Sequence, residues 1–161
     1  MFTKKKFLSH AFLMSSLFIQ SSLTGPHKIN IEGASILKVG NPATYEIIIK
    51  NVGGFDLEDV VVHFEGCEKE GLEFISTVSE MMVTKVFTAD SCIAVEARLK
   101  KLSANRACSF SVKTRAGYLK SDEELKSFNL QVTVTGENFR KGTLKKSVTL
   151  YSDFKNSVTL A

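Results

Sequence analysis

The chain has 161 residues, with 21 Lys and Arg against 17 Asp and Glu and a formal net charge of +4. This length fits one domain that can bury a core without cross-links. Residues 1–25 hold three of the basic residues and none of the acidic ones, so the rest of the chain carries 18 basic against 17 acidic residues, a net charge of +1. This balance argues against nonspecific nucleic-acid binding, which depends on clustered positive charge.

The first 25 residues have the order of a secretory signal. Lys4–Lys6 precede a mostly apolar run, Phe7–Ile19, and small and polar residues follow at Gln20–Gly25. We expect a signal helix that is removed on export, because a basic, then apolar, then small-residue order is typical of such segments. A buried N-terminal helix is the alternative, and the run is shorter than the roughly 20 apolar residues of a membrane span. The sequence therefore predicts a signal peptide at 1–25, a domain at 26–161 and a location in the periplasm, outer membrane or cell surface of a bacterium.

After the signal, apolar and polar residues alternate in short runs that turn residues separate. Nine segments have this pattern: Ser35–Val39, Thr44–Lys50, Val60–Glu65, Leu72–Phe74, Val83–Thr88, Ile93–Lys100, Cys108–Lys113, Phe128–Thr135 and Leu144–Leu150. One polar face on each strand favours antiparallel sheets with solvent outside. We therefore expect an all-β, immunoglobulin-like antiparallel sandwich of seven to nine strands.

The alternation also predicts a core and one short helix. The apolar phase of separate strands contains Tyr45, Ile47, Ile49, Phe110 and Val132, and we expect all five to be buried. Only the segment 121–126 reads as a helix, because its first four residues resemble a capping box.

The segment Val39–Gly53, VGNPATYEIIIKNVG, carries the clearest family signal. It resembles the start of the conserved repeat domain of bacterial surface proteins (domain of unknown function eleven), which also occurs in the large cysteine-rich outer-membrane protein of chlamydiae. Further similarity lies at Leu57–Val62 and Gly71–Ser76, and at Leu102–Asn105 with Asn105 where glycine is usual. The resemblance implies an exported immunoglobulin-like sandwich and not an enzyme.

Three cysteines lie at positions 67, 92 and 108. Cys108 has the apolar phase of its strand, so we expect a buried free thiol. Cys67 and Cys92 have the setting of loop or strand-edge residues, and export would allow them to pair. They are the candidate disulfide residues, either joined to each other or linking separate chains as a disulfide-linked oligomer.

A hairpin turn is expected at residues 101–106. It would pair the strands on either side of it and place Cys92 opposite Thr114, about 20 Å along the ladder from Cys108. On or beside this hairpin lie five basic residues, Lys100, Lys101, Arg106, Lys113 and Arg115. Charges that discourage edge-to-edge pairing of strands are one interpretation. A basic interaction patch for an acidic partner, such as a glycan or an anionic lipid surface, is the other.

The sequence offers little for catalysis or metal binding. It contains no CxxC pair, no nucleophile elbow, no phosphate loop and no HExxH motif. His63 is expected to be a solvent-facing strand residue, and Asp56, Glu58 and Asp59 form an acidic turn whose spacing does not match a calcium loop. We predict no catalytic residue, no cofactor and no metal site.

The predicted function is that of a non-enzymatic exported envelope or surface module, which acts through protein–protein contacts or structural assembly. The alternatives are a periplasmic chaperone or assembly factor that presents a sheet edge, and a secreted effector that binds host proteins. The expected partners are other envelope proteins or a host protein, with peripheral membrane association open and nucleic acid excluded.

Overall fold

The computed structural model describes residues 25–67, 71–89, 92–119 and 124–153. Apart from Gly25, the predicted signal peptide lies outside these residues. The described chain forms ten strands: β1 (His27–Glu32), β2 (Ile36–Lys38), β3 (Pro42–Asn51), β4 (Leu57–Cys67), β5 (Leu72–Ser79), β6 (Met82–Ala89), β7 (Cys92–Leu102), β8 (Ala107–Ala116), β9 (Leu125–Thr135) and β10 (Gly142–Tyr151).

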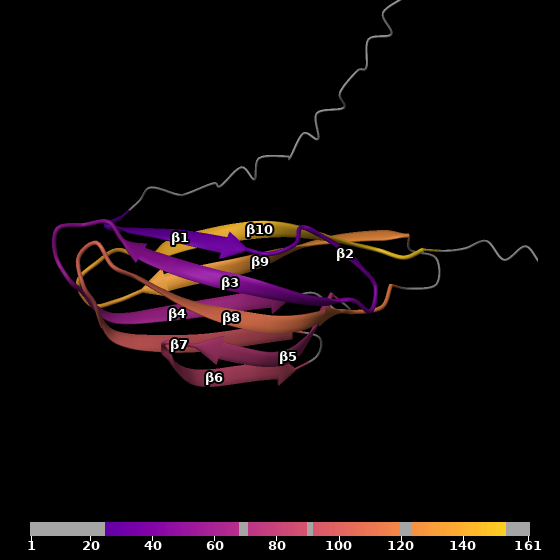
Figure 1. Ribbon diagram of the computed structural model, residues 1–161, viewed down its shortest axis with the longest axis horizontal. Helices are drawn as coiled ribbons and strands as arrows, with labels where there is room; N and C mark the ends of the chain where they lie inside the picture. The colour runs from indigo at the N-terminus through magenta and orange to yellow at the C-terminus, as the bar shows by residue number, and fades with distance from the viewer. Residues whose placement is uncertain (1–24, 68–70, 90–91, 120–123, 154–161) are drawn as a thin grey trace, which may run out of the picture.

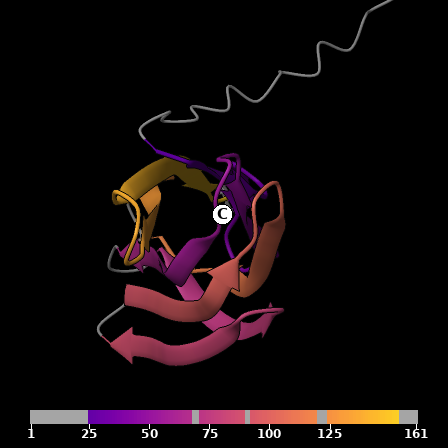
Figure 2. The same ribbon diagram turned by 90° about the vertical axis from the view of Figure 1, so that its left-hand side faces the viewer.

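The strands form a two-layered sandwich, as the alternation predicts (Figure 1). One sheet has the order β1-β3-β8-β5 and the other the order β2-β10-β9-β4-β7-β6. Seen end-on, the two sheets wrap around a common interior (Figure 2). All pairings are antiparallel except that of β2 with β10, which is parallel, with Ile36 opposite Thr149. The immunoglobulin-like fold class is confirmed, with one strand more than expected in the described part.

The additional strand is β1, which the sequence analysis did not include. His27, Ile29 and Ile31 are its buried residues, and they alternate with more exposed ones. The alternation was visible but short, and it lies directly after the predicted signal. A second difference is at the expected helix 121–126: residues 120–123 lie outside the described residues, and Leu125 begins strand β9.

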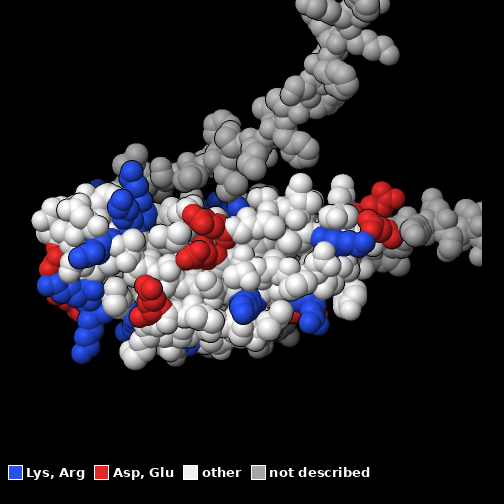
Figure 3. All heavy atoms as spheres, in the orientation of Figure 1, with Lys and Arg blue, Asp and Glu red and all other residues white. Residues whose placement is uncertain are grey.

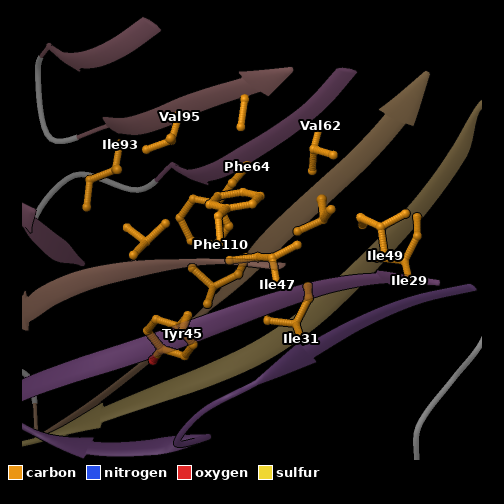
Figure 4. Packing of buried hydrophobic residues seen from close by; sticks show 14 of the residues in the cluster. Ile29, Ile31, Tyr45, Ile47, Ile49, Val62, Phe64, Ile93, Val95 and Phe110 are labelled. Atoms are coloured by element: carbon orange, nitrogen blue, oxygen red, sulfur yellow. The ribbon is translucent and has the colours of Figure 1, made fainter. Parts of the chain in front are cut away.

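Apolar side chains from both sheets fill the interior (Figure 4). The five residues predicted to be core are all buried, with exposed fractions of 0–1%: Tyr45, Ile47, Ile49, Phe110 and Val132. Tyr45 also satisfies its hydroxyl, which donates to the Ala34 carbonyl at 3.1 Å. The strand phase read from the sequence is therefore correct, since a slip by one residue would expose all of these side chains.

The expected hairpin around residues 101–106 is wrong. β7 pairs with β4 and β6, whereas β8 pairs with β3 and β5 in the other sheet. Thr114 is opposite Ala43 and Phe74, not Cys92. The turn carries the chain from one layer to the other. Alternation identifies a strand but not its neighbour, and sequential strands are neighbours only about two-thirds of the time.

A buried asparagine ties the loops together at one end of the sandwich. Asn51, the last residue of β3, is fully buried. Its Nδ2 donates to the carbonyls of Phe55 at 2.8 Å and Leu102 at 3.0 Å, and its Oδ1 accepts from the Gly53 amide at 3.0 Å. Buried polar groups need hydrogen-bond partners. These three bonds therefore give the Asn-x-Gly sequence at the end of the segment Val39–Gly53 a structural role.

Candidate functional site

Both sheets end in an exposed, apolar strand on the same side of the sandwich. β5 is the last strand of the four-stranded sheet and β6 the last of the six-stranded sheet. Four large apolar side chains on these strands are 41–68% exposed: Ile75, Val78, Met82 and Val86. We call these four residues the β5–β6 edge surface. Single exposed apolar residues are ordinary, but a group on two free edges indicates an interaction site.

Local irregularities expose these side chains. The β5–β8 register shifts between Phe74 and Ser76, so Ile75 lies in a bulge. Beyond the bulge, Val78 is opposite Ser111, on the outer face of the sheet. Met82 is opposite Arg98 on the outer face of the other sheet. Bulges break the regular row of backbone hydrogen-bonding groups, so these edges offer side chains more readily than a backbone template.

A hollow of about 480 Å³ lies beside Met82 on the outer face of the six-stranded sheet. Six residues from β4, β6 and β7 line it: Asp59, Val61, Met82, Arg98, Leu99 and Lys100. Met82 belongs to both features. The hollow combines an apolar lining with charges of both signs, and Arg98 Nε lies 3.2 Å from Glu96 Oε1. This composition suits a protein side chain better than a charged small molecule, because interface pockets hold an apolar anchor inside a polar rim.

The opposite margin of the sandwich is closed. There β1 lies near β10, and His27 is 3% exposed with its ring against Phe139, 5.1 Å between centroids. A Cβ at Gly142 would overlap the His27 ring, so only glycine permits this packing. Burial lowers the pKa of His27 below its usual value, and its Nδ1 has no hydrogen-bond partner. The β1 side of this margin is therefore packed like core, whereas Ile36 on the neighbouring edge strand β2 is exposed.

The predicted basic patch is divided between the two ends of the sandwich. Arg115 is opposite Pro42 at the start of β3, whereas Ala107, beside Arg106, is opposite Lys50 near its end. These positions are about 26 Å apart at the usual strand rise. Blue side chains accordingly gather at the left-hand end of Figure 3, with others towards the right. The five residues do not form one site, because β7 and β8 belong to different sheets.

One member of the predicted patch has an acidic partner within the chain. Lys101 Nζ lies 2.5 Å from Asp56 Oδ2, and the amide of Ala104 donates to Asp56 Oδ1 at 3.0 Å. The Lys101 contact and this amide lower the pKa of Asp56, and Asp56 in turn raises the pKa of Lys101. The Asp56 carboxylate thus links the loop before β4 to Lys101 and to the turn that follows β7.

Each cysteine has a defined place. Cys108 is 6% exposed and has a free thiol, as predicted, and burial, followed by the nearby charge of Glu80, raises its pKa to about 11. Cys67 and Cys92 are opposite each other at the end of the β4–β7 ladder. No disulfide bond is present among the side chains that the structure describes.

The remaining polar candidates show no catalytic arrangement. His63 is half-buried and its Nε2 lies 2.7 Å from Glu65 Oε1 on the same strand. Within the described ranges, no group of three His, Cys, Asp or Glu residues is arranged to hold a metal ion. No helix in those ranges has the length and apolar character needed to cross a membrane.

The sequence matches no protein-family model and no curated protein. Solved structures share its fold. A BcpA variant (D312A), the major pilin subunit of Bacillus cereus, aligns at a TM-score of 0.55 and 12% identity, over 78% of this chain and 40% of that one. A cohesin module from a Clostridium perfringens family 33 glycoside hydrolase aligns at a TM-score of 0.52 and 14% identity, over 80% and 98%. At these identities the likeness shows the fold alone, and this chain spans less than half the length of the pilin chain.

The β5–β6 edge surface was not found from the sequence. A signal was present, because Ile75 does not follow the alternation of Leu72 and Phe74. An apolar residue in the wrong phase marks either a bulge or an exposed contact, and here the two coincide.

Proposed function

We propose that this chain is an exported, non-enzymatic module of a bacterial envelope that works through protein–protein contacts at the β5–β6 edge surface. One observation carries the proposal. Four large apolar side chains lie exposed on the two free edge strands of one margin, and an apolar hollow lies beside one of them, Met82. At the opposite margin, β1 buries Ile29 and Ile31, and Ile36 on β2 is the large apolar residue exposed among the described residues of these two strands.

Three further features support the proposal. The order of residues 1–25 is that of a secretory signal. The segment Val39–Gly53 resembles a repeat domain of bacterial surface proteins. A pilin subunit and a cohesin module share the fold.

A periplasmic assembly factor that adds a client strand to β5 is the second candidate. Its supporting observation is that β5, LEFISTVS, has no Lys or Arg and only one free edge. The bulge between Phe74 and Ser76 counts against it, because strand addition needs an uninterrupted row of backbone donors and acceptors. β6 is a poorer template still, since it has Lys85 and its own register shift between Val83 and Lys85. We therefore favour a contact through the exposed side chains over the addition of a client strand.

Photo-crosslinking in cells tests the contact surface. A benzophenone side chain at Val78 should give discrete adducts with another protein in the envelope fraction. The same group at Lys28, an exposed residue on the edge strand β1 of the same sheet, is the matched control and should give none. Equal adducts at both positions, or none at Val78, would contradict a contact at this margin.

Fractionation and hydrogen exchange separate the alternatives. Export predicts a mature N-terminus between Ser22 and Lys28, and an intact Met1 on a cytosolic protein would end the proposal. Accumulation in the culture medium would favour an effector that binds host proteins. If the adduct forms by strand addition, the β5 amides should become protected from exchange, whereas side-chain docking leaves them unchanged.

A further inference from the structure

The ladder between β4 and β7 ends in two opposed cysteines. Its register is constant over its whole length, from Leu57 opposite Leu102 to Cys67 opposite Cys92. The pair next to the end, Gly66 with Ile93, keeps the same register. The juxtaposition of the two thiol residues is therefore a consequence of a ladder that keeps one register from end to end, with a single pair missing at Asp59.

Opposed positions in an antiparallel ladder satisfy the backbone requirement of a disulfide. Directly opposite Cα atoms lie about 4.5 or 5.5 Å apart, depending on the hydrogen-bonding class of the pair. A disulfide joins Cα atoms that are about 4.4–6.8 Å apart. Neither strand needs to move along the other for Cys67 and Cys92 to be joined.

The two positions also belong to the same face of the sheet. Buried residues occupy alternate pairs of the ladder, as at Phe64 opposite Val95. The intervening pairs, such as His63 opposite Glu96, belong to the outer face. Counted along the ladder, Cys67 and Cys92 occupy the register position of this second set.

The odd number of cysteines does not prevent an intrachain bond, because the third cysteine is not available for pairing. Cys108 is opposite Ile49 in the other sheet, is buried, and has a thiol pKa raised to about 11. A buried thiol with a raised pKa forms little thiolate and exchanges slowly. It is therefore neither a partner nor a competitor for the other two.

We propose that Cys67 and Cys92 form an intrachain disulfide across the β4–β7 ladder, an inference that rests on export for its occurrence in the cell. The bond would close a ring whose chain contains both β5 and β6. It would thus hold together β4 and β7, the strands that directly precede and follow β5 and β6 in the chain. A cross-link of this kind limits the freedom of the unfolded chain and so favours the folded state.

The oxidant is a disulfide compound, either oxidised glutathione or a thiol–disulfide oxidoreductase. One cysteine thiolate attacks the oxidant's disulfide, forms a mixed disulfide and releases one thiolate of the oxidant. The second cysteine thiolate then attacks the protein sulfur and releases the other. Two protons leave the protein thiols, two electrons pass to the oxidant, and the oxidant ends as two thiols.

The test is thiol mapping on the purified full chain at low protein concentration, after equilibration with oxidised glutathione and with alkylation under denaturing conditions. In the wild type, only Cys108 should be alkylated, and the peptides that carry Cys67 and Cys92 should be joined until reduction. Cys67→Ser and Cys92→Ser are matched variants, and each should leave its remaining surface cysteine alkylated. Reduction should lower the denaturation midpoint of the wild type but not of Cys67→Ser.

A bond from Cys108 to either other cysteine would overturn the proposal, and so would chains linked through Cys67 or Cys92 in place of the intrachain bond. Complete alkylation of all three thiols after oxidation would overturn it as well. The purified protein tests the pairing without any dependence on location. Alkylation of thiols in whole cells then tests export. If the bond forms in the purified chain but the thiols are reduced and Met1 is intact in cells, the proposed pairing is supported and the proposed function is contradicted.

Discussion

The two edge strands of the four-stranded sheet are made of similar residues and have different surroundings. β1 places Ile29 and Ile31 in the core at 6% and 3% exposure. β5, at the other edge, leaves Ile75 and Val78 at 48% and 63%. Both strands carry large apolar residues, so the presence of such residues does not decide which edge is closed.

The difference lies in what covers each strand. β1 approaches β10, and the His27 ring fills the space beside Phe139 and Gly142. β5 is followed by β6, the edge strand of the other sheet, and both strands leave large apolar side chains exposed. Apolar side chains that remain exposed on such a margin lose the stabilisation of burial, about 25 cal/mol per Å². A contact with another protein restores that stabilisation, and this is the basis of the functional proposal.

The largest expected effect comes from one substitution made at both edges. Ile31→Ala should lower the free energy of unfolding by ~2–5 kcal/mol, because it empties a filled position in the core. Ile75→Ala should change it by no more than about 0.5 kcal/mol, as for other surface substitutions. Urea unfolding followed by circular dichroism measures both. Similar losses at the two positions would mean that the edges are equally closed and that β5 offers no free surface.

The second prediction concerns the loop end that both sheets share. Asn51→Ala removes the donor for two carbonyls and the acceptor for the Gly53 amide. A buried group left without a partner costs about 1–3 kcal/mol. Only the bond to the Leu102 carbonyl is fully buried and the other two are partly buried, so a total loss of about 2–4 kcal/mol is expected. Asn138→Ala, which removes the exposed bonds to Asp56 and Glu58, is the control and should cost less. A smaller loss at Asn51 than at Asn138 would contradict the structural role given to this motif.

Much of this architecture could be read from the sequence, and the reasons for success and failure are physical. Alternation reports which side chains face the core, so Tyr45, Ile47 and Phe110 were placed correctly. Alternation contains no information on which strand is the neighbour, so the pairing of β7 with β8 was wrong. The candidate basic patch failed for the same reason, since it depended on that hairpin.

The candidate contact surface shows a different limit. The residue type alone does not distinguish an exposed apolar residue on an edge strand from a buried one. The packing of the folded chain decides its exposure. The cysteines illustrate the gain from structure. The sequence left open whether Cys67 and Cys92 join each other or separate chains, and the β4–β7 register now favours the first alternative.

The third prediction tests the closed margin by pH. Burial lowers the pKa of His27 from its usual value of 6.5. As the pH falls below about 6.5, the unfolded chain takes up a proton that the folded chain resists, so stability that is present above this pH is lost as the pH falls through the folded pKa. His27→Gln should remove part of the pH dependence of the unfolding midpoint between pH 7.5 and 5.5. The control, Asn30→Gln, changes a residue of the same strand that has no titrating group and should retain it. The same pH dependence in wild type and His27→Gln would contradict a buried neutral imidazole at this margin.

The smallest effect is expected from charges placed on the open margin. Val78 is opposite Ser111 and diagonal to Lys113, which lies on the same outer face. Val78→Lys should leave the free energy of unfolding within about 0.5 kcal/mol of the wild type, because an edge strand accepts lysine readily. Val78→Glu should be the more stable of the two by a few tenths of a kcal/mol, since its charge is opposite to that of Lys113. The difference should shrink in 1 M salt, where exposed charges are screened. Both variants should nevertheless lose the envelope adducts, because each places a charge in an apolar contact. The adducts are measured with the benzophenone side chain placed at Ile75 in each variant. A variant that loses about 2 kcal/mol or more of stability would show instead that Val78 is packed in the folded chain, and the two margins would then not differ in the way proposed here.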